Sequence, residues 1–134
     1  YDNIDHAESK DPSTVRYCLG LARLRRDGYV GLYATRYREG RVNTQGLMSA
    51  GTKLIINARC APGGSVRVEV CDNFDEALEP CTFANCDPMT GDSVAHTVTW
   101  KGSAEIPVRD WRKLRFALRD AELFSFRFVG SGPE

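Results

Sequence analysis

The stretch KLRFALRDAELFSFRFV, residues 113–129, contains two runs in which apolar and polar residues alternate. The apolar residues on one face are Leu114, Phe116 and Leu118 in the first run and Phe124, Phe126 and Phe128 in the second. A period of two is typical of β-strands with one buried face, and helical spacing does not explain it. The stretch therefore predicts two strands, at residues 113–120 and 122–129.

The same alternation recurs upstream, at residues 30–37, in KLIINAR (53–59), in SVRVEV (65–70) and in VAHTVTW (94–100). The segment Ala61–Gly64 has the composition of a turn, so KLIINAR and SVRVEV are predicted to form a hairpin. About seven or eight strands in all predict an all-β fold, a two-sheet antiparallel β-sandwich of jelly-roll-like topology. The predicted core between the sheets consists of Val66, Val68, Val70, Val98, Leu114, Phe116, Leu118, Phe124, Phe126 and Phe128.

The length of 134 residues suits one domain, which we place at residues 14–130 between a polar arm (1–13) and a short tail (131–134). No apolar run approaches the ~20 residues of a membrane span, and the polar start places any targeting signal outside this sequence. Acidic and basic residues balance at 18 each, which argues against nucleic acid as a partner. We expect a monomer.

Five cysteines are many for this length and indicate an oxidising, secreted or extracellular location. None forms a close pair of the metal-binding type, so a zinc site is not expected. Cys71 ends the SVRVEV run, and Cys81 and Cys86 lie in the loop after it. We therefore predict a disulfide from Cys71 to Cys81 or Cys86, with at least one thiol left over.

Several motifs resemble the β-sandwich domain found C-terminal to five-bladed propellers of the glycoside hydrolase family 32 and 43 type. They are Arg25–Tyr29, Cys86–Pro88, Gly91–Ser93, Trp100 and Phe124–Phe128. The resemblance covers residues 17–128. It implies an accessory module of carbohydrate-active or cell-surface proteins, similar in shape to carbohydrate-binding modules, and it supplies no binding residue to carry over.

Aromatic rings that stack on sugars are the first candidates for a binding site. Tyr33 and Tyr37 share the polar face of their predicted strand with Thr35, so both are predicted to be exposed stacking platforms. Trp111 lies in a loop, where it is either an exposed platform or a plug for one end of the sandwich. Trp100 shares a strand face with Val98 and is assigned to the core.

Arginines supply the second set of candidates, because fourteen of the 18 basic residues are arginine. Arg115, Arg119 and Arg127 lie opposite buried positions, as does Arg67. If their strands adjoin, they form a surface suited to uronic acid or sulfate groups. Otherwise they are solvated residues that pair with Glu69 or Glu122. The Arg25–Asp27 motif is interpreted as a structural corner.

Asp87 and Asp92 flank a loop that could hold a structural calcium ion through oxygen ligands. The alternative is that both carboxylates cap free backbone amides in ordinary turns. No other cofactor is expected.

An enzyme is not expected. Ser93 and His96 lie on a predicted strand, whose spacing puts them on opposite faces or at different heights, so a hydrogen bond between a nucleophile and its base is not expected. The sequence instead predicts a non-catalytic carbohydrate-binding module, for acidic or sulfated polysaccharide. The alternative is a structural accessory domain that packs against a neighbouring catalytic or propeller module without a ligand of its own. A ligand module presents exposed Tyr or Trp with Arg, whereas a packing module presents a large apolar patch.

Overall fold

The computed structural model describes residues 17–130. Within this range the chain forms β-strands and no α-helix, so the described residues include no helix that could cross a membrane. The all-β prediction is confirmed. The predicted arm at 1–13 and the tail at 131–134 lie outside the described residues.

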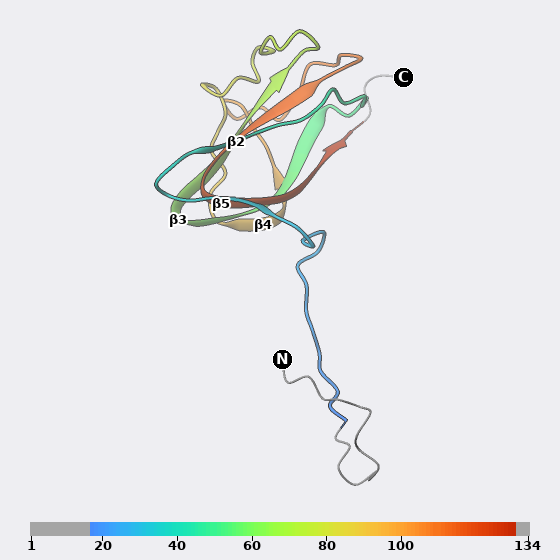
Figure 1. Cartoon of the computed structure of the whole chain (residues 1–134). Coiled ribbons are helices and arrows are strands. Elements are labelled where there is room, and N and C mark those ends of the chain that lie inside the picture. Colours follow the sequence, from blue (N-terminus) through green and yellow to red (C-terminus); the bar gives the residue numbers. More distant parts are fainter. Residues whose placement is uncertain (1–16, 131–134) are drawn as a thin grey trace.

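The strands are β1 (Leu32–Ala34), β2 (Gly40–Asn43), β3 (Lys53–Cys71), β4 (Asp92–Thr97) and β5 (Lys113–Val129). All pairings are antiparallel in the order β1-β5-β3-β4, and β2 also pairs with β5. Figure 1 shows β3 and β5 curving together through the molecule, so the sheet is one curled sheet. The division into two separate sheets that the sequence predicted is not confirmed.

The predicted hairpin between KLIINAR and SVRVEV is wrong, because both runs belong to β3. Each run pairs with β5, from Lys53 opposite Val129 to Cys71 opposite Lys113. The Ala61–Gly64 segment makes a shift of register in that ladder instead of a reversal. A Cβ atom at Gly64 would clash with the backbone carbonyl oxygen of Asp120, so the strands can approach closely here only because this residue is glycine.

The two strands predicted at 113–120 and 122–129 are likewise one continuous strand, β5. The chain bends between them at Asp120, which has a positive φ of 45°. Aspartate tolerates this conformation better than most residues. The seven or eight expected strands become five partly because these two neighbouring pairs are each one bent strand.

The core lies inside the curl and is built from both halves of β3 and β5. The Phe116 and Phe126 rings, one from each half of β5, meet with their centroids 5.5 Å apart. The predicted core residues that are buried are Val66, Val68, Val70, Val98, Leu114, Phe116 and Leu118. Phe126 and Phe128 pack against this cluster and are partly buried. Trp100 is buried as expected, and its indole N–H donates to the Val68 carbonyl at 2.9 Å.

Phe124 does not join this core cluster, which corrects the prediction. The ladder of β3 and β5 shifts between Asn57 and Ala58, so that Ala58 faces Leu123 and Phe124 is left without a partner on β3. Such a bulge reverses the alternation of side chains. The Phe124 ring instead lies beneath the guanidinium of Arg25, 4.7 Å from its centroid.

Arg25 fastens the N-terminal part of the chain to the sheet beside this bulge. Its guanidinium donates to the Asn57 side chain (2.6 Å) and to the carbonyls of Ala58 (3.1 Å) and Ser93 (2.8 Å). It also pairs with Asp92 at 2.5 Å. The Asn57 amide in turn donates to the Arg26 carbonyl at 2.7 Å. Only arginine offers five donors in a fork, and these contacts match the structural interpretation of the Arg25–Asp27 motif.

Replacing Arg25 with alanine should therefore destabilise the protein, because the buried Asn57 side chain and the carbonyls of Ala58 and Ser93 lose their donor. We expect Arg25→Ala to lower the free energy of unfolding by about 2–3 kcal/mol. Arg26→Ala is the matched control: the Arg26 side chain is 80% exposed, whereas that of Arg25 is 16% exposed. The control should change stability by less than about 0.5 kcal/mol. Urea denaturation measures both, and equal losses would show that Arg25 does not anchor the chain.

Candidate functional site

Three of the predicted ligand-binding residues, Tyr33, Tyr37 and Arg119, belong to segments that meet where β5 bends. Tyr33 lies on β1 opposite Glu122 of β5, and Tyr37 lies in the turn that follows β1. Arg119 precedes the bend residue Asp120, whose backbone N–H donates to the Thr35 carbonyl at 3.3 Å. We call residues 33–41 together with Arg119 and Asp120 the tyrosine–arginine corner.

Both tyrosines of the corner face solvent, with Tyr33 62% and Tyr37 82% exposed. The Tyr33 hydroxyl donates to the Asp120 carboxylate at 3.1 Å, and this hydrogen bond raises the pKa of Tyr33. The Arg36 guanidinium lies over one face of the Tyr37 ring, 4.9 Å from its centroid. Arg36 also donates to the Tyr37 hydroxyl at 2.7 Å. Because most of its surface remains exposed, the Tyr37 ring can also stack on a ligand.

The corner contains an open hollow of about 480 Å³. Its lining residues are Tyr33, Ala34, Thr35, Arg38, Glu39, Gly40 and Arg41. Glu39 is shared by two arginines, Arg41 at 2.6 Å and Arg67 at 3.2 Å. Arg36, Arg38 and Arg119 have no carboxylate partner within residues 17–130. The corner is therefore rich in positive charge that its own acids do not pair.

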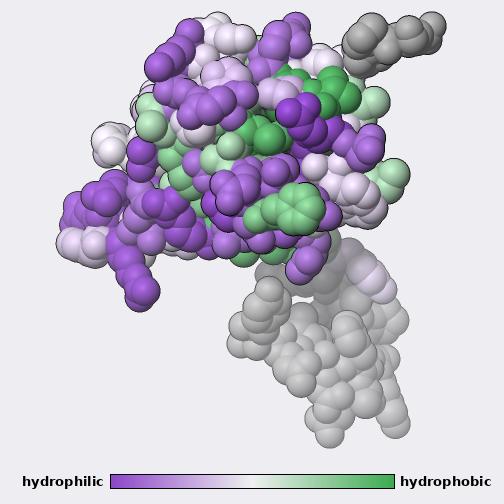
Figure 2. Space-filling model, turned by 90° about the horizontal axis from the view of Figure 1, so that it is seen from above, coloured by the Kyte–Doolittle hydropathy of each residue, from purple (hydrophilic) through white to green (hydrophobic). Residues whose placement is uncertain are grey.

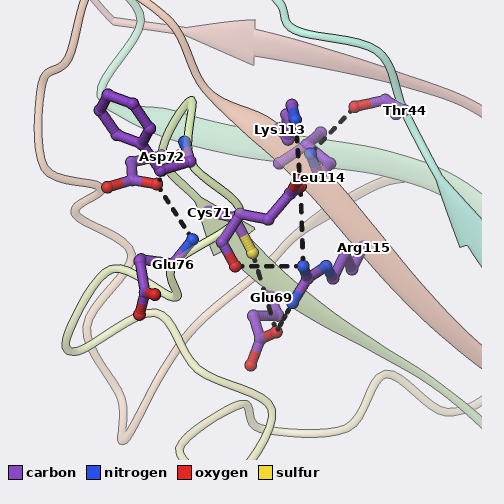
Figure 3. Close-up of polar contacts among 10 residues, drawn as sticks. Thr44, Glu69, Cys71, Asp72, Glu76, Lys113, Leu114 and Arg115 are labelled. Atoms are coloured by element: carbon purple, nitrogen blue, oxygen red, sulfur yellow. Dashed lines mark hydrogen bonds and ion pairs between the residues drawn. The ribbon is translucent and has the colours of Figure 1, made fainter.

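Arg115 is held by acids on the outer face of the sheet and is not part of the corner's unpaired charge. Its guanidinium pairs with Glu69 at 3.2 Å (Figure 3). It also pairs with Asp75 at 3.7 Å. Lys113 pairs with the same Asp75 at 3.1 Å. Of the two alternatives for the strand arginines, the geometry at Arg115 is that of a residue paired with Glu69. The same holds for Arg59, which pairs with Glu122 at 2.7 Å.

Arg127 and Trp111 lie apart from the corner. Arg127 is exposed near the end of β5, opposite Ile55 of β3. Trp111 immediately precedes Arg112, which bridges to Leu47. The Trp111 ring packs closely over Gly46 and is half-exposed. Nearly half of the Trp111 surface therefore meets solvent, and its packing contact is with Gly46, outside the buried core cluster.

The two aspartates of the calcium hypothesis are both engaged with protein groups. Asp87 accepts from the Thr99 hydroxyl at 2.6 Å and from the Gly102 N–H at 2.8 Å, and these bonds lower the pKa of Asp87. Asp92 pairs with Arg25. The described part of the chain contains no cluster of three or more acidic, histidine or cysteine side chains that could hold a metal ion. The contacts of Asp87 are those of a turn cap.

Ser93 and His96 occupy different register positions on β4, opposite Ala58 and Ile56 of β3. The Ser93 hydroxyl accepts from the Ala95 N–H at 3.2 Å. Burial lowers the pKa of His96. Serine activation requires a direct hydrogen bond to the base, and the contacts of Ser93 do not include one to His96.

The predicted disulfide is not formed, and all five cysteines are free thiols. Cys71 lies on the outer face of β3, with its sulfur 3.8 Å from the Glu69 carboxylate (Figure 3). Cys81 and Cys86 belong instead to the buried cluster inside the curl. A bridge needs two Cβ atoms about 4 Å apart. Cys71 lies on one face of β3 and the buried cluster lies on the other, so Cys71 cannot form a bridge with Cys81 or Cys86.

Sequence analysis missed Arg36 and Arg38, which flank Tyr37 in the turn after β1. The sequence feature that could have identified them is the tripeptide Arg-Tyr-Arg at residues 36–38, close to Tyr33. The search for alternating residues along strands did not consider residues in turns. It also could not show that Asp120, more than eighty positions away, would bond to Tyr33. That contact depends on the pairing of β1 with β5.

Comparison of the chain with protein-family models, with curated protein sequences and with solved structures gave no match. The resemblance to sandwich domains beside five-bladed propellers therefore stays a prediction. What the site can bind follows from its own residues.

The cysteines provide a direct check on the core. Burial raises the pKa of Cys60, Cys71 and Cys86, and it raises that of Cys81 to about 12. Because the thiolate is the reactive form, these four should resist alkylation at neutral pH while exposed Cys18 reacts. Intact-mass analysis should show one label on the native protein and five after unfolding without reductant. Fewer labels on the unfolded, unreduced protein than on the reduced one would reveal a disulfide and contradict the structure.

Proposed function

We propose that this chain is a non-catalytic carbohydrate-binding module and that the tyrosine–arginine corner is its binding site. The observation that carries the proposal is the hollow of about 480 Å³, which is lined by exposed Tyr33 and by Arg38, an arginine without a carboxylate partner within residues 17–130. Exposed Tyr37 lies next to Arg38 in the same turn. Both halves of the curled sheet cover one core, which is consistent with the jelly-roll-like sandwich shape of such modules.

The chemistry of the corner favours an acidic or sulfated polysaccharide. The exposed ring of Tyr37 can stack on the apolar face of a pyranose ring, as aromatic side chains do with flat apolar surfaces. The planar guanidiniums of Arg38 and Arg119 can bind uronate or sulfate oxygens in pairs. A neutral sugar would use the tyrosines and leave these charges without a partner.

An extracellular location remains part of the proposal. It rests on the resemblance and on the ligand class, because the free thiols remove the argument from disulfides.

A structural docking domain is the second candidate, and a specific feature favours it. Near Trp111, exposed Met48 and Val108 line a shallow hollow of about 410 Å³ together with Ser49, Ala50, Arg109 and Asp110. Figure 2 shows that apolar areas also reach the surface of the face seen from above, between hydrophilic side chains. A partly apolar surface of this kind suits contact with a neighbouring folded module.

Binding to polygalacturonate, dextran sulfate and neutral dextran, measured by isothermal titration calorimetry at low and high salt, tests the proposal. We expect binding to the two anionic polymers that weakens as salt screens the exposed arginines. Tyr37→Ala and Arg119→Ala should each weaken binding by about 1 kcal/mol, roughly fivefold, without loss of folding.

Arg127→Ala is the matched control, because it removes an exposed arginine of β5 outside the corner. Its affinity for the anionic polymers should equal that of the unaltered protein. Equal losses from Arg119→Ala and Arg127→Ala would mean diffuse charge attraction instead of a site at the corner. Absence of binding to all three polymers would reject the proposal and favour the docking domain.

A further inference from the structure

The second half of β5 has one edge without a neighbouring strand. β1 and β2 share the edge of β5 opposite β3, and the pairing of β1 ends where Leu32 meets Leu123. Beyond that point, Phe124–Val129 pair with β3 alone within the described part of the chain. Unpaired N–H and C=O groups on such an edge are a template for a further strand.

An apolar groove of about 500 Å³ lies beside this open edge. Its lining residues are Val30, Leu32, Val42, Phe116, Leu123, Phe124, Ser125 and Phe126. Val30 is 75% exposed, and Leu32 is more than half exposed. The groove therefore exposes apolar surface of the core, which an apolar strand at the open edge would cover.

The same chain contains a segment with the matching pattern. Residues 17–24, YCLGLARL, run extended and belong to no strand. Tyr17, Leu19 and Leu21 alternate with small residues, and each exposes more than four fifths of its surface. The segment thus has one large apolar face, which costs free energy when it stays in water.

We propose that residues 17–24 of one copy of this chain add as an edge strand to β5 of a second copy, with Tyr17, Leu19 and Leu21 in its groove. Eight extended residues span about 26 Å, enough to cover the six-residue open edge of about 20 Å. The occupant has the period of two that the edge requires. This dimer differs from the monomer that the sequence predicted, and it is independent of the tyrosine–arginine corner.

The way in which residues 17–24 are held favours binding to the groove of a second copy over binding to the groove of the same molecule. Arg25 fixes its C-terminal end to Asn57 and Asp92, and Figure 1 shows residues 17–24 running away from the sheet. Reciprocal exchange also doubles the contact. If each large side chain buries roughly 150 Å² against an equal area of groove, two exchanges bury on the order of 1,800 Å², within the range of a stable interface.

The test uses the full chain and measures molar mass by light scattering after size exclusion across a wide concentration range. The segment variant carries Leu19→Asp and Leu21→Asp, and the groove variant carries Val30→Asp at an exposed position. We expect the unaltered protein to be a dimer and each variant to be a monomer with an unchanged circular dichroism spectrum. Met48→Asp, an exposed apolar residue outside the groove, is the matched control and should remain a dimer.

Mixing the two variants provides the sharper result. The segment variant keeps an intact groove and the groove variant keeps an intact segment, so one exchange can form and a one-to-one complex should appear. Folded variants that fail to associate when mixed would overturn the proposal. A monomeric unaltered protein would also overturn it, including the case in which hydrogen exchange shows residues 17–24 protected within their own molecule.

Discussion

The pairing of β3 with β5 is the constraint on which the rest of the structure depends. The ladder runs from Lys53 opposite Val129 to Cys71 opposite Lys113, and every other strand attaches to one of these two. A flat ladder of this length would expose both faces. The register shift at Ala61–Gly64 and the positive φ of Asp120 let the ladder curl, so that Phe116 and Phe126 meet inside it. The curl thus replaces the second sheet of a sandwich as the means of covering the core.

The bend that closes the core also creates the candidate site. Asp120 sits at the bend, where it accepts from the Tyr33 hydroxyl and donates its N–H to Thr35. The turn after β1 therefore lies against the bend, together with Arg36, Tyr37 and Arg38. The second shift of register, near Asn57, has a different consequence. It turns Phe124 outward, where Arg25 lies over its ring and binds the Asn57 side chain.

Alternation of apolar residues was enough to predict an all-β chain and most of the core, because burial of one strand face imposes a period of two. Val66, Val68 and Phe116 are buried for this reason. What alternation could not predict was connectivity. The Ala61–Gly64 segment has the composition of a hairpin turn but forms a bend within β3. Composition cannot distinguish the two, because the pairing of both neighbouring runs with β5 determines which one forms. The prediction that Phe124 lies in the core was wrong for a related reason, because a bulge shifts the alternation of side chains along β5.

In the candidate site, Tyr33 and Tyr37 were predicted to be exposed and are exposed. The pairing of Arg115 with Glu69 and Asp75 could not be predicted, because it depends on which strands adjoin and on a distant loop. The predicted disulfide was wrong because sequence position does not show on which face of β3 a cysteine lies.

The most direct test of this account is the set of nuclear Overhauser effects between backbone protons of neighbouring strands. Continuous pairing of β3 with β5 predicts contacts between Ile56 and Phe126 in one half of the ladder and between Val68 and Phe116 in the other. It also predicts no cross-strand contact between residues 53–59 and 65–70. A ladder of contacts joining those two segments would show that they form a hairpin, and would contradict the curled pair of strands on which the core and the site depend.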